Sequence, residues 1–341
     1  MPETEITTPV QALDELGRPQ NFGWARAANF IYNHNLVSAS RRRISESDRY
    51  ILFSPSHQVI FEILDDGYMG YLFCSVVFLK DKKRSTHTYL THFSLGCFDL
   101  PGDSETSSIK FRQKRKLLDF AVMGGGVRII KVDIPKFGRR RNLRGEMVLT
   151  PQPLAESLAT NMPWRGRGNA FLCSRHSPWY SVEGVIQLGA KEIIFTGGNG
   201  WGIFNWARGV RPHSDLRFWA GGCGQAGGRQ VGFSVGYSSA DSSMGTENGF
   251  FIDGKLHKLN QVTFHIPAGK LLPWRFTSND NRLEMIFTPS QDRDESHQMF
   301  FYSLKRRQFF GTFSGKVILD DGSEYEFHDI DGMAERRKSR L

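Results

Sequence analysis

Short segments of alternating apolar and polar residues, separated by tight turns, restrict the fold of this chain more than any other feature. Asp253-Gly254 joins Gly249–Ile252 to Lys255–Lys258, and Asp321-Gly322 joins a second pair of such segments. Asp-Gly in this setting predicts a two-residue hairpin turn, because that turn requires positive φ at both central residues. No apolar pattern with a helical period extends over a long segment. We therefore predict an all-β protein with few helices.

The predicted strands form two groups separated by a proline-rich connection. The first group comprises residues 49–53, 57–64, 68–79, 86–93, 107–112, 116–123 and 126–134. Prolines confine any helix in residues 151–167, and strands resume at 169–175 and 180–188. A chain of 341 residues suits two domains of roughly 150 residues each. We expect two tandem antiparallel β-barrel or sandwich domains, residues 20–178 and 179–338.

The charge balance is basic, with 44 Lys and Arg against 35 Asp and Glu, and a net charge of +9. The basic residues form short runs at 41–43, 80–84, 112–116, 139–144 and 336–340. Most of these runs fall at predicted turns or at the end of the sequence, where solvated charge is the simplest interpretation. Binding to an anionic polymer is the alternative. Because no nucleic-acid-binding motif accompanies the runs, we expect no specific nucleic-acid partner.

Other sequence patterns argue against a membrane span, a metal site and a nucleotide site. No apolar run reaches the roughly 18 residues of a transmembrane helix, and the acidic, polar start does not resemble a signal peptide. The four cysteines form no C-x-x-C pair, so a cytoplasmic location with reduced thiols is expected. The ten histidines form no ligand motif. Residues 222–227 match G-x-G-x-x-G but precede an alternating segment instead of a helix, which predicts a hairpin. We expect no cofactor.

Residues 197–259 form the segment most typical of a binding site. Trp201, Trp206 and Trp219 lie among many glycines and several basic residues. Large flat side chains beside a few directional polar groups commonly line small-molecule pockets. The three indoles either stack on a sugar, a terpenoid or another flat apolar ligand, or simply fill the core of a barrel.

Glu247, followed by Asn248, is the first candidate catalytic residue. It precedes an apolar segment, and at the mouth of a barrel its desolvated carboxyl would have a raised pKa and could transfer a proton at neutral pH. The alternative is a strand-end residue that binds neighbouring backbone. Arg208 and His213 are candidate residues for binding an anionic or carbonyl group of the ligand.

Several further residues are candidates for ligand contacts. Asn161, Trp164 and Arg165 come from the proline-rich connection and are expected to cover the same pocket. Glu183 is a carboxylate in an otherwise apolar strand, where alternation places it either in the interior or in solvent.

Motifs along most of the chain resemble those of the family named domain of unknown function 2804. The matching segments are residues 156–164, 182–184, 205–209, 246–248, 253–257, 273–275, 310–315 and 332–335. The family is distantly similar to carotenoid 1,2-hydratases and to lipocalin-like fungal cyclases, which implies two lipocalin-like domains with a ligand pocket in or between them. Fold does not fix the reaction. The chain has Asn205 where the resemblance implies an aspartate, so an acid–base step of relatives is altered or lost here if that aspartate takes part in it.

Three functions follow from these observations. The first is a lyase, hydratase or cyclase that uses Glu247 for proton transfer, with Arg208, His213 and Asn248 polarising an apolar or sugar-like substrate. The second is a carrier or sensor that uses the same pocket without chemistry. The third is the anionic-polymer binder. The sequence does not determine the substrate or the oligomeric state.

Overall fold

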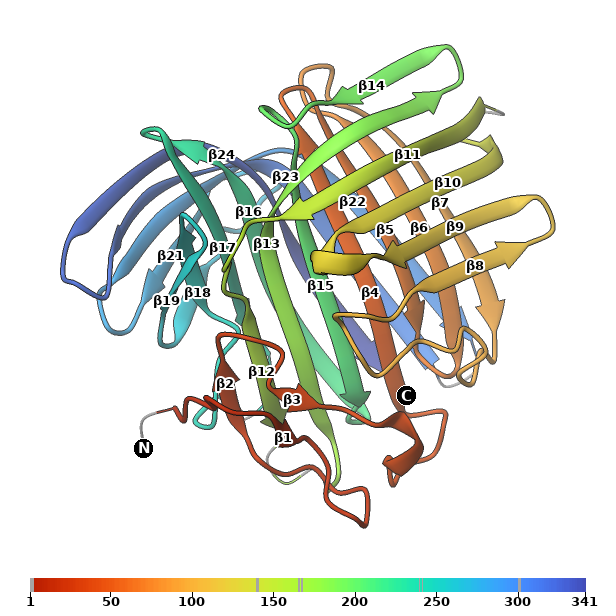
Figure 1. Ribbon diagram of the computed structural model, residues 1–341, viewed down its shortest axis with the longest axis vertical. Helices are drawn as coiled ribbons and strands as arrows, with labels where there is room; N and C mark the ends of the chain where they lie inside the picture. Colours follow the sequence, from red (N-terminus) through yellow and green to blue (C-terminus); the bar gives the residue numbers. More distant parts are fainter. Residues whose placement is uncertain are drawn as a thin grey trace.

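Two large curled antiparallel sheets, packed against each other, form nearly the whole protein (Figure 1). The computed structural model describes residues 3–138, 141–164, 166, 168–238, 240, 242–299 and 302–341. The helical segments within these residues are two 3-10 turns, η1 (His34–Leu36) and η2 (Gly124–Gly126). The prediction of an all-β protein made of two lipocalin-like antiparallel units is therefore confirmed.

The first sheet has a ten-stranded path with three strands attached to its side. In spatial order the path is β7 (Lys83–His92), β6 (Met69–Phe78), β5 (His57–Asp65), β4 (Ile44–Ser54), β15 (Trp201–Val210), β13 (Phe171–Leu188), β11 (Arg141–Pro151), β10 (Arg128–Phe137), β9 (Lys116–Val122) and β8 (Ile109–Gln113). Attached to this path are β12 (Leu158–Pro163), β2 (Gly23–Ala25) and β14 (Lys191–Phe195).

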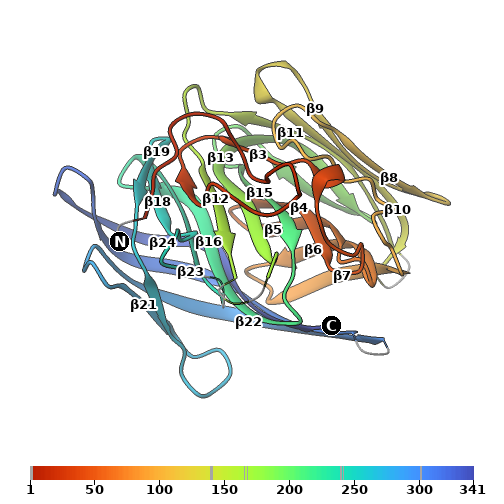
Figure 2. The same ribbon diagram turned by 90° about the horizontal axis from the view of Figure 1, so that it is seen from below.

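The second sheet has nine strands, and a small parallel pair lies outside both sheets. The nine strands, in spatial order, are β19 (Lys255–Lys258), β18 (Gly249–Ile252), β17 (Arg229–Tyr237), β16 (Ser214–Ala226), β24 (Glu324–Arg340), β23 (Tyr302–Ile318), β22 (Leu283–Met299), β21 (Trp274–Ser278) and β20 (Val262–His265). The small pair is β1 (Val10–Gln11) with β3 (Phe30–Ile31). They belong to the N-terminal segment, which lies across the lower ends of β12 and β13 (Figures 1 and 2).

The predicted hairpin turns are present. Asp253 and Gly254 have φ of 49° and 80° and join β18 to β19, as the Asp-Gly signal requires. The residues of the G-x-G-x-x-G match lie at the end of β16, before the turn into β17, so the hairpin interpretation is confirmed.

Strand β13 differs from its prediction because it runs without interruption through Pro178. A bulge accommodates the proline: the register with β15 shifts between Pro178 and Tyr180, and Trp179 takes a φ of 75°. The predicted domain boundary at 178–179 falls inside this strand, whereas the chain passes from the first sheet to the second between Val210 and Ser214. The division into domains at residue 178 stays a prediction.

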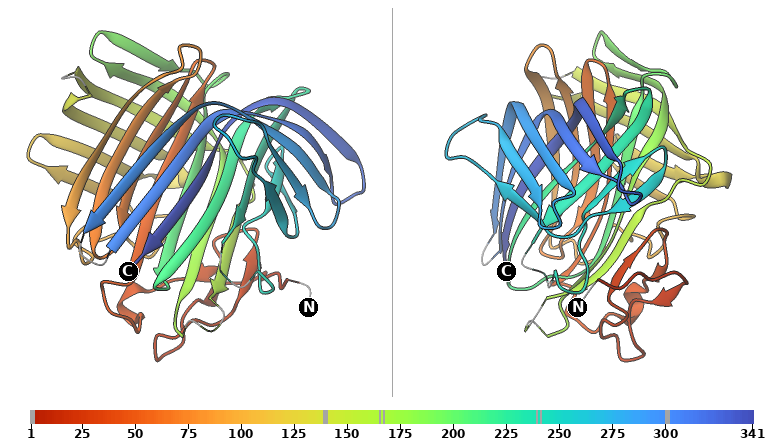
Figure 3. Two further views of the ribbon diagram at one scale, coloured as in Figure 1. Left: turned by 180° about the vertical axis from the view of Figure 1, so that it is seen from behind. Right: turned by 90° about the vertical axis from the view of Figure 1, so that its left-hand side faces the viewer.

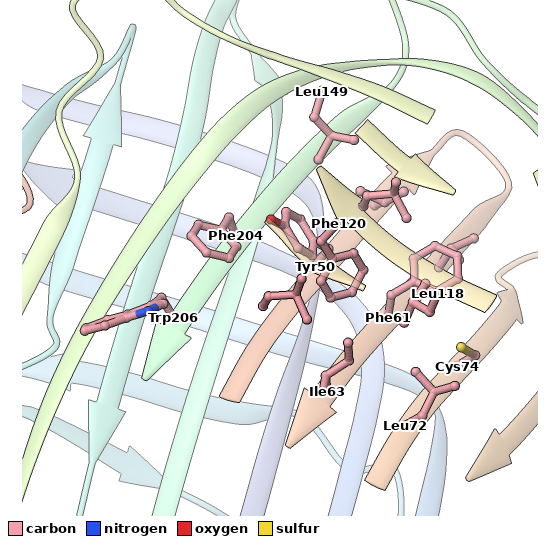
Figure 4. Packing of buried hydrophobic residues seen from close by; sticks show 14 of the residues in the cluster. Tyr50, Phe61, Ile63, Leu72, Cys74, Leu118, Phe120, Leu149, Phe204 and Trp206 are labelled. Carbon is pink, nitrogen blue, oxygen red and sulfur yellow. The ribbon is translucent and has the colours of Figure 1, made fainter. Parts of the chain in front are cut away.

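The central strands of the first sheet are buried on both faces. On β5, Phe61 and Ile63 point into the curl of the first sheet, while Ile60 points toward the second sheet. Side chains fill the inside of the curl at this level, where Tyr50 packs against Phe204 (Figure 4). Continuous burial explains why β6 and most of β5 are apolar in sequence instead of alternating.

The layer between the two sheets combines apolar residues with buried ion pairs. Strands β22, β23 and β24 cross behind the first sheet (Figure 3). Arg306 on β23 is fully buried and forms ion pairs with Glu62 on β5 and Glu295 on β22, and it also donates a hydrogen bond to the Tyr71 hydroxyl at 2.9 Å. Arg49 on β4 bridges Glu62 and Glu335 at 2.8 and 3.1 Å. Buried charges are tolerated only when paired and hydrogen-bonded in this way.

Removing Arg306 should destabilise the protein strongly. In Arg306→Leu, Glu62 and Glu295 lose a buried counter-charge, and we expect the free energy of unfolding to fall by about 3 to 5 kcal/mol in urea denaturation. The matched control is Arg275→Leu, which breaks an exposed pair with Glu284 and should cost at most about 1 kcal/mol. Equal losses of unfolding free energy in the two variants would contradict a stabilising role for the buried ion pairs.

Candidate functional site

Glu247 lies at the centre of a buried polar cluster where the two sheets meet. Its Oε1 accepts hydrogen bonds from the Ser174 hydroxyl at 2.7 Å and from Arg217 Nη2 at 2.6 Å, and lies 2.9 Å from His176 Nε2. Its Oε2 also lies 2.6 Å from Arg217 Nη2. The carboxylate is only 4% exposed, so these contacts replace almost all of its hydration.

Three elements bring the cluster together. Ser174 and His176 alternate on β13 and therefore share one face of the first sheet, while Arg217 comes from β16 of the second sheet. Asn248 fixes the segment that carries Glu247. Its side-chain carbonyl accepts from the Gly236 amide at 2.7 Å, and its amide donates to the Asn260 carbonyl at 2.8 Å.

The ionisation of Glu247 differs from the expectation. Burial favours the neutral acid, but the Arg217 guanidinium and the hydrogen bonds from His176 and Ser174 outweigh it and hold the pKa of Glu247 well below its usual range. The predicted raised pKa is therefore wrong, because the sequence did not reveal the cation beside the buried carboxylate. Glu247 is a carboxylate at neutral pH.

His176 connects Glu247 to Asn205. Its Nδ1 lies 2.9 Å from Asn205 Oδ1, and its ring stacks on Trp219 with centroids 6.2 Å apart. Both ring nitrogens of His176 therefore have a side-chain partner, Asn205 on one side and Glu247 on the other, and these contacts fix the orientation of the ring.

Three cavities surround this cluster. The largest, about 340 Å³, lies beside the second sheet; Glu247 and Asn248 are on its wall, with apolar lining from Met162, Phe218, Val262, Phe264 and Ile266. Ser174 and Trp206 line a second cavity of about 260 Å³ beneath the N-terminal segment. His176, Asn205, Trp206, Arg217 and Trp219 line a third, of about 50 Å³, between the sheets. Glu247, Ser174 and His176 thus each reach a different cavity.

Comparison with known proteins places the chain in a family. Residues 3–341 match the family described as "Domain of unknown function (DUF2804)". The chain belongs to DUF2804. The comparison with curated proteins gave no matching sequence.

Solved structures share the fold of this DUF2804 protein at low sequence identity. The crystal structure of CghA with Sch210972 is 11% identical with a TM-score of 0.55, covering 88% of this chain and 89% of CghA. NE1406 of Nitrosomonas europaea is 12% identical with a TM-score of 0.50, covering 89% of this chain and 95% of that one. Kievitone hydratase from Nectria haematococca is 8% identical with a TM-score of 0.44, covering 86% and 88%. At such identities the likeness shows the fold alone.

The three tryptophans of the predicted binding segment lie in different surroundings. Trp219 and Trp206 are buried and line the cavity between the sheets. Trp206 Nε1 is buried without a hydrogen-bond partner among the described residues, which leaves a donor beside two cavities. Trp201 packs on Trp179 at 4.4 Å between ring centroids and lines a separate hollow with Asp331.

Arg208 and His213 do not join the Glu247 cluster. Arg208 is fully buried beside Trp206, where it pairs with Asp48 at 2.7 Å and donates to the Pro101 carbonyl. His213 is exposed between β15 and β16, and its carbonyl accepts from the Leu341 amide. Neighbours in sequence are thus separated in space, and neither placement supports the predicted catalytic role.

The remaining predicted contacts are scattered. Asn161 is buried and donates to the carbonyls of Gln20 and Ala12, so it anchors the N-terminal segment. Trp164 packs in a small apolar cluster with Met162, which itself lines the largest cavity. Glu183 is exposed. Arg165 lies outside the described residues.

Sequence reasoning missed Ser174, His176 and Arg217. The predicted strand ended at Arg175 because Ser177 and Pro178 follow, which placed His176 in a turn. Continuing the alternation by one step would have put Ser174 and His176 on one face. Arg217 carried no usable signal, because its contact with Glu247 spans 30 residues, from β16 to the segment before β18.

The Glu247 pairing predicts a specific pH dependence of stability. Because the pKa of folded Glu247 is depressed, its contribution is complete above its ordinary value of 4.5 and is lost as pH falls toward the folded pKa. Glu247→Gln should therefore lower the melting temperature at pH 7, and the difference from the unsubstituted protein should shrink below about pH 4.5. Calorimetry across this range tests it, with exposed Glu284→Gln as the control. A difference that grows on acidification would contradict the assignment.

Proposed function

We propose that this protein is an enzyme of the lyase, hydratase or cyclase kind that acts on an apolar or sugar-like small molecule without a metal or nucleotide cofactor. The observation that carries the proposal is the buried Glu247 carboxylate on the wall of the largest cavity, with His176 directly behind it. A cavity of about 340 Å³ lies within the range of small-molecule sites, and its apolar wall beside few polar groups matches their usual composition.

Proton transfer in this proposal is carried by the Glu247 carboxylate. Glu247 faces the ligand, takes a proton from it and returns that proton to another atom of the ligand, so Glu247 ends the cycle as a carboxylate; His176 Nε2, 2.9 Å from Oε1, holds the carboxylate in place. Arg217 keeps the carboxyl acidic, so it releases the proton readily. Arg217 Nε is buried without a hydrogen-bond partner among the described residues, and Arg217 lines the small cavity between the sheets, on the other side of Glu247 from the largest cavity.

Asn205 positions the imidazole in this proposal. As a neutral acceptor at Nδ1 it orients the ring without adding a second carboxylate. An aspartate at this position would place a second negative charge beside the same ring. The asparagine therefore keeps Nε2 oriented toward Glu247 without adding charge.

A carrier or sensor is the second candidate function. Both oxygens of Glu247 and both ring nitrogens of His176 are already bonded within the protein, as in a cluster whose role is to hold two sheets together. The cavity would then bind its ligand through the apolar wall alone.

Substitution in the cavity wall tests binding for both candidates. Phe264→Ala should weaken binding of the apolar dye anilinonaphthalenesulfonate by about tenfold, because it removes a large aromatic surface from the cavity. Ile286→Ala removes a half-exposed apolar side chain that does not line the cavity and should leave dye fluorescence unchanged. An equal response of both variants would show that the dye binds elsewhere.

Turnover separates the enzyme from the carrier. Native mass spectrometry of the purified protein identifies the bound molecule, and its conversion is then followed. Glu247→Gln should reduce turnover by at least about 100-fold while changing ligand affinity less than about threefold, and His176→Gln should shift the pH profile of the remaining activity. Unchanged turnover in Glu247→Gln would eliminate the proton-transfer role, and intact binding without any turnover would favour the carrier.

A further inference from the structure

Basic residues that are scattered along the sequence gather on one rim of the first sheet. The turns β6–β7, β8–β9, β10–β11 and β13–β14 follow the upper and right-hand edge of the sheet in Figure 1. Their exposed cations, together the basic rim, are Lys80, Lys82, Lys83, Arg84, Lys114, Arg115, Lys136 and Lys191. Two of the five basic runs of the sequence, 80–84 and 112–116, contribute to this rim.

Contacts between the turns show that they share one end of the curled sheet. Arg141, beside the β10–β11 turn, donates a hydrogen bond to Ser85 near the start of β7. Lys191 Nζ lies 4.9 Å from the ring centroid of Phe78 at the end of β6. Lys116 Nζ, at the start of β9, lies 3.9 Å from the ring centroid of Tyr89 on β7. The curl therefore brings the β6–β7 turn against the β10–β11 and β13–β14 turns, and the start of β9 against β7 further along that strand.

The positive charge of the basic rim is not neutralised by the protein. None of its eight cations forms an ion pair with a described residue, and the exposed carboxylates on these turns are Asp81 and Glu192. Nearby groups respond to the excess charge. Burial, and then Lys116, lowers the pKa of His87, and burial with Lys114 lowers the pKa of Lys116 itself.

The basic rim also lacks exposed large apolar side chains among its described residues. The exposed large hydrophobic residues of the protein lie outside these four turns. Single-stranded nucleic acids are usually bound by aromatic side chains on which bases stack, together with a groove that follows the backbone. The basic rim instead presents flexible side chains, mostly lysines, on projecting turns. Such a surface suits a partner whose negative charge is spread over a wide area.

We propose that the basic rim docks the protein on the surface of an anionic phospholipid membrane. Attachment is electrostatic and peripheral, since no apolar group of the described turns is available to insert into the bilayer. The attraction weakens with salt because exposed charges are screened over about 10 Å at 0.1 M ionic strength and about 3 Å at 1 M. This inference is independent of the proposed catalytic role of Glu247.

Vesicle co-sedimentation with the full chain tests the proposal. The protein should pellet with phosphatidylcholine vesicles that contain about 30% phosphatidylserine, remain in solution with pure phosphatidylcholine, and dissociate at about 0.5 M salt. Replacing Lys82, Lys83, Lys114 and Arg115 with Gln should reduce the apparent partition coefficient by at least about tenfold.

The matched control removes the same net charge from the second sheet. Lys305, Arg336, Lys338 and Arg340 are exposed and form no ion pair with described residues, and their replacement with Gln should change vesicle binding less than about twofold. Circular dichroism confirms that both variants fold. Absence of binding to the anionic vesicles, or an equal loss in both variants, would overturn the proposal. Tighter rim-dependent binding to a DNA duplex than to vesicles would do so as well, and would identify nucleic acid as the partner.

Discussion

Burial of both faces of the central strands is the constraint on which the rest of the structure depends. Strands β4, β5 and β6 contribute one face to the inside of the first curl and the other to the layer shared with β22, β23 and β24. Polar groups in that layer cannot reach water, so each must find a partner there. The Arg306 pairs and the Glu247 cluster both meet this requirement. In each, a guanidinium group of the second sheet contacts a carboxylate, and the first sheet supplies a further partner: Glu62 in the Arg306 pairs and His176 in the Glu247 cluster.

This constraint also decides which protonation states are available for chemistry. A buried carboxyl in an apolar site holds its proton, but Glu62, Glu247 and Glu335 of this layer each face at least one arginine. Asp66 shows the same balance, since Arg211 and Arg337 outweigh its burial and lower its pKa to about 2. A carboxyl group that faces an arginine between the sheets is therefore ionised at neutral pH, as Glu247 and Asp66 are.

The sequence was informative where the determinants of structure are local. Alternation and Asp-Gly turns predicted the strands and hairpins, and the motifs of the DUF2804 family predicted the architecture. Glu247, Asn248, Asn205, Trp206 and Trp219 do lie around one cluster. The rest depends on contacts between residues distant in sequence: His176 of the first sheet reaches Glu247 only because the two sheets pack together, and its predicted strand ended one residue before it, at Arg175. Arg208 was misjudged because its partner Asp48 lies on a strand far away in sequence.

The 17-residue strands β22, β23 and β24 have a consequence for how a molecule enters and leaves. One part of these strands lies in the core of the second sheet, and another part carries residues such as Leu304 and Met333 that pack on the first sheet. Separating the two sheets would expose the apolar layer and break the ion pair between Arg306 and Glu62. The largest cavity is lined by residues of the second sheet and by Met162, and it is partly open to solvent, so a molecule can enter it while the two sheets stay packed.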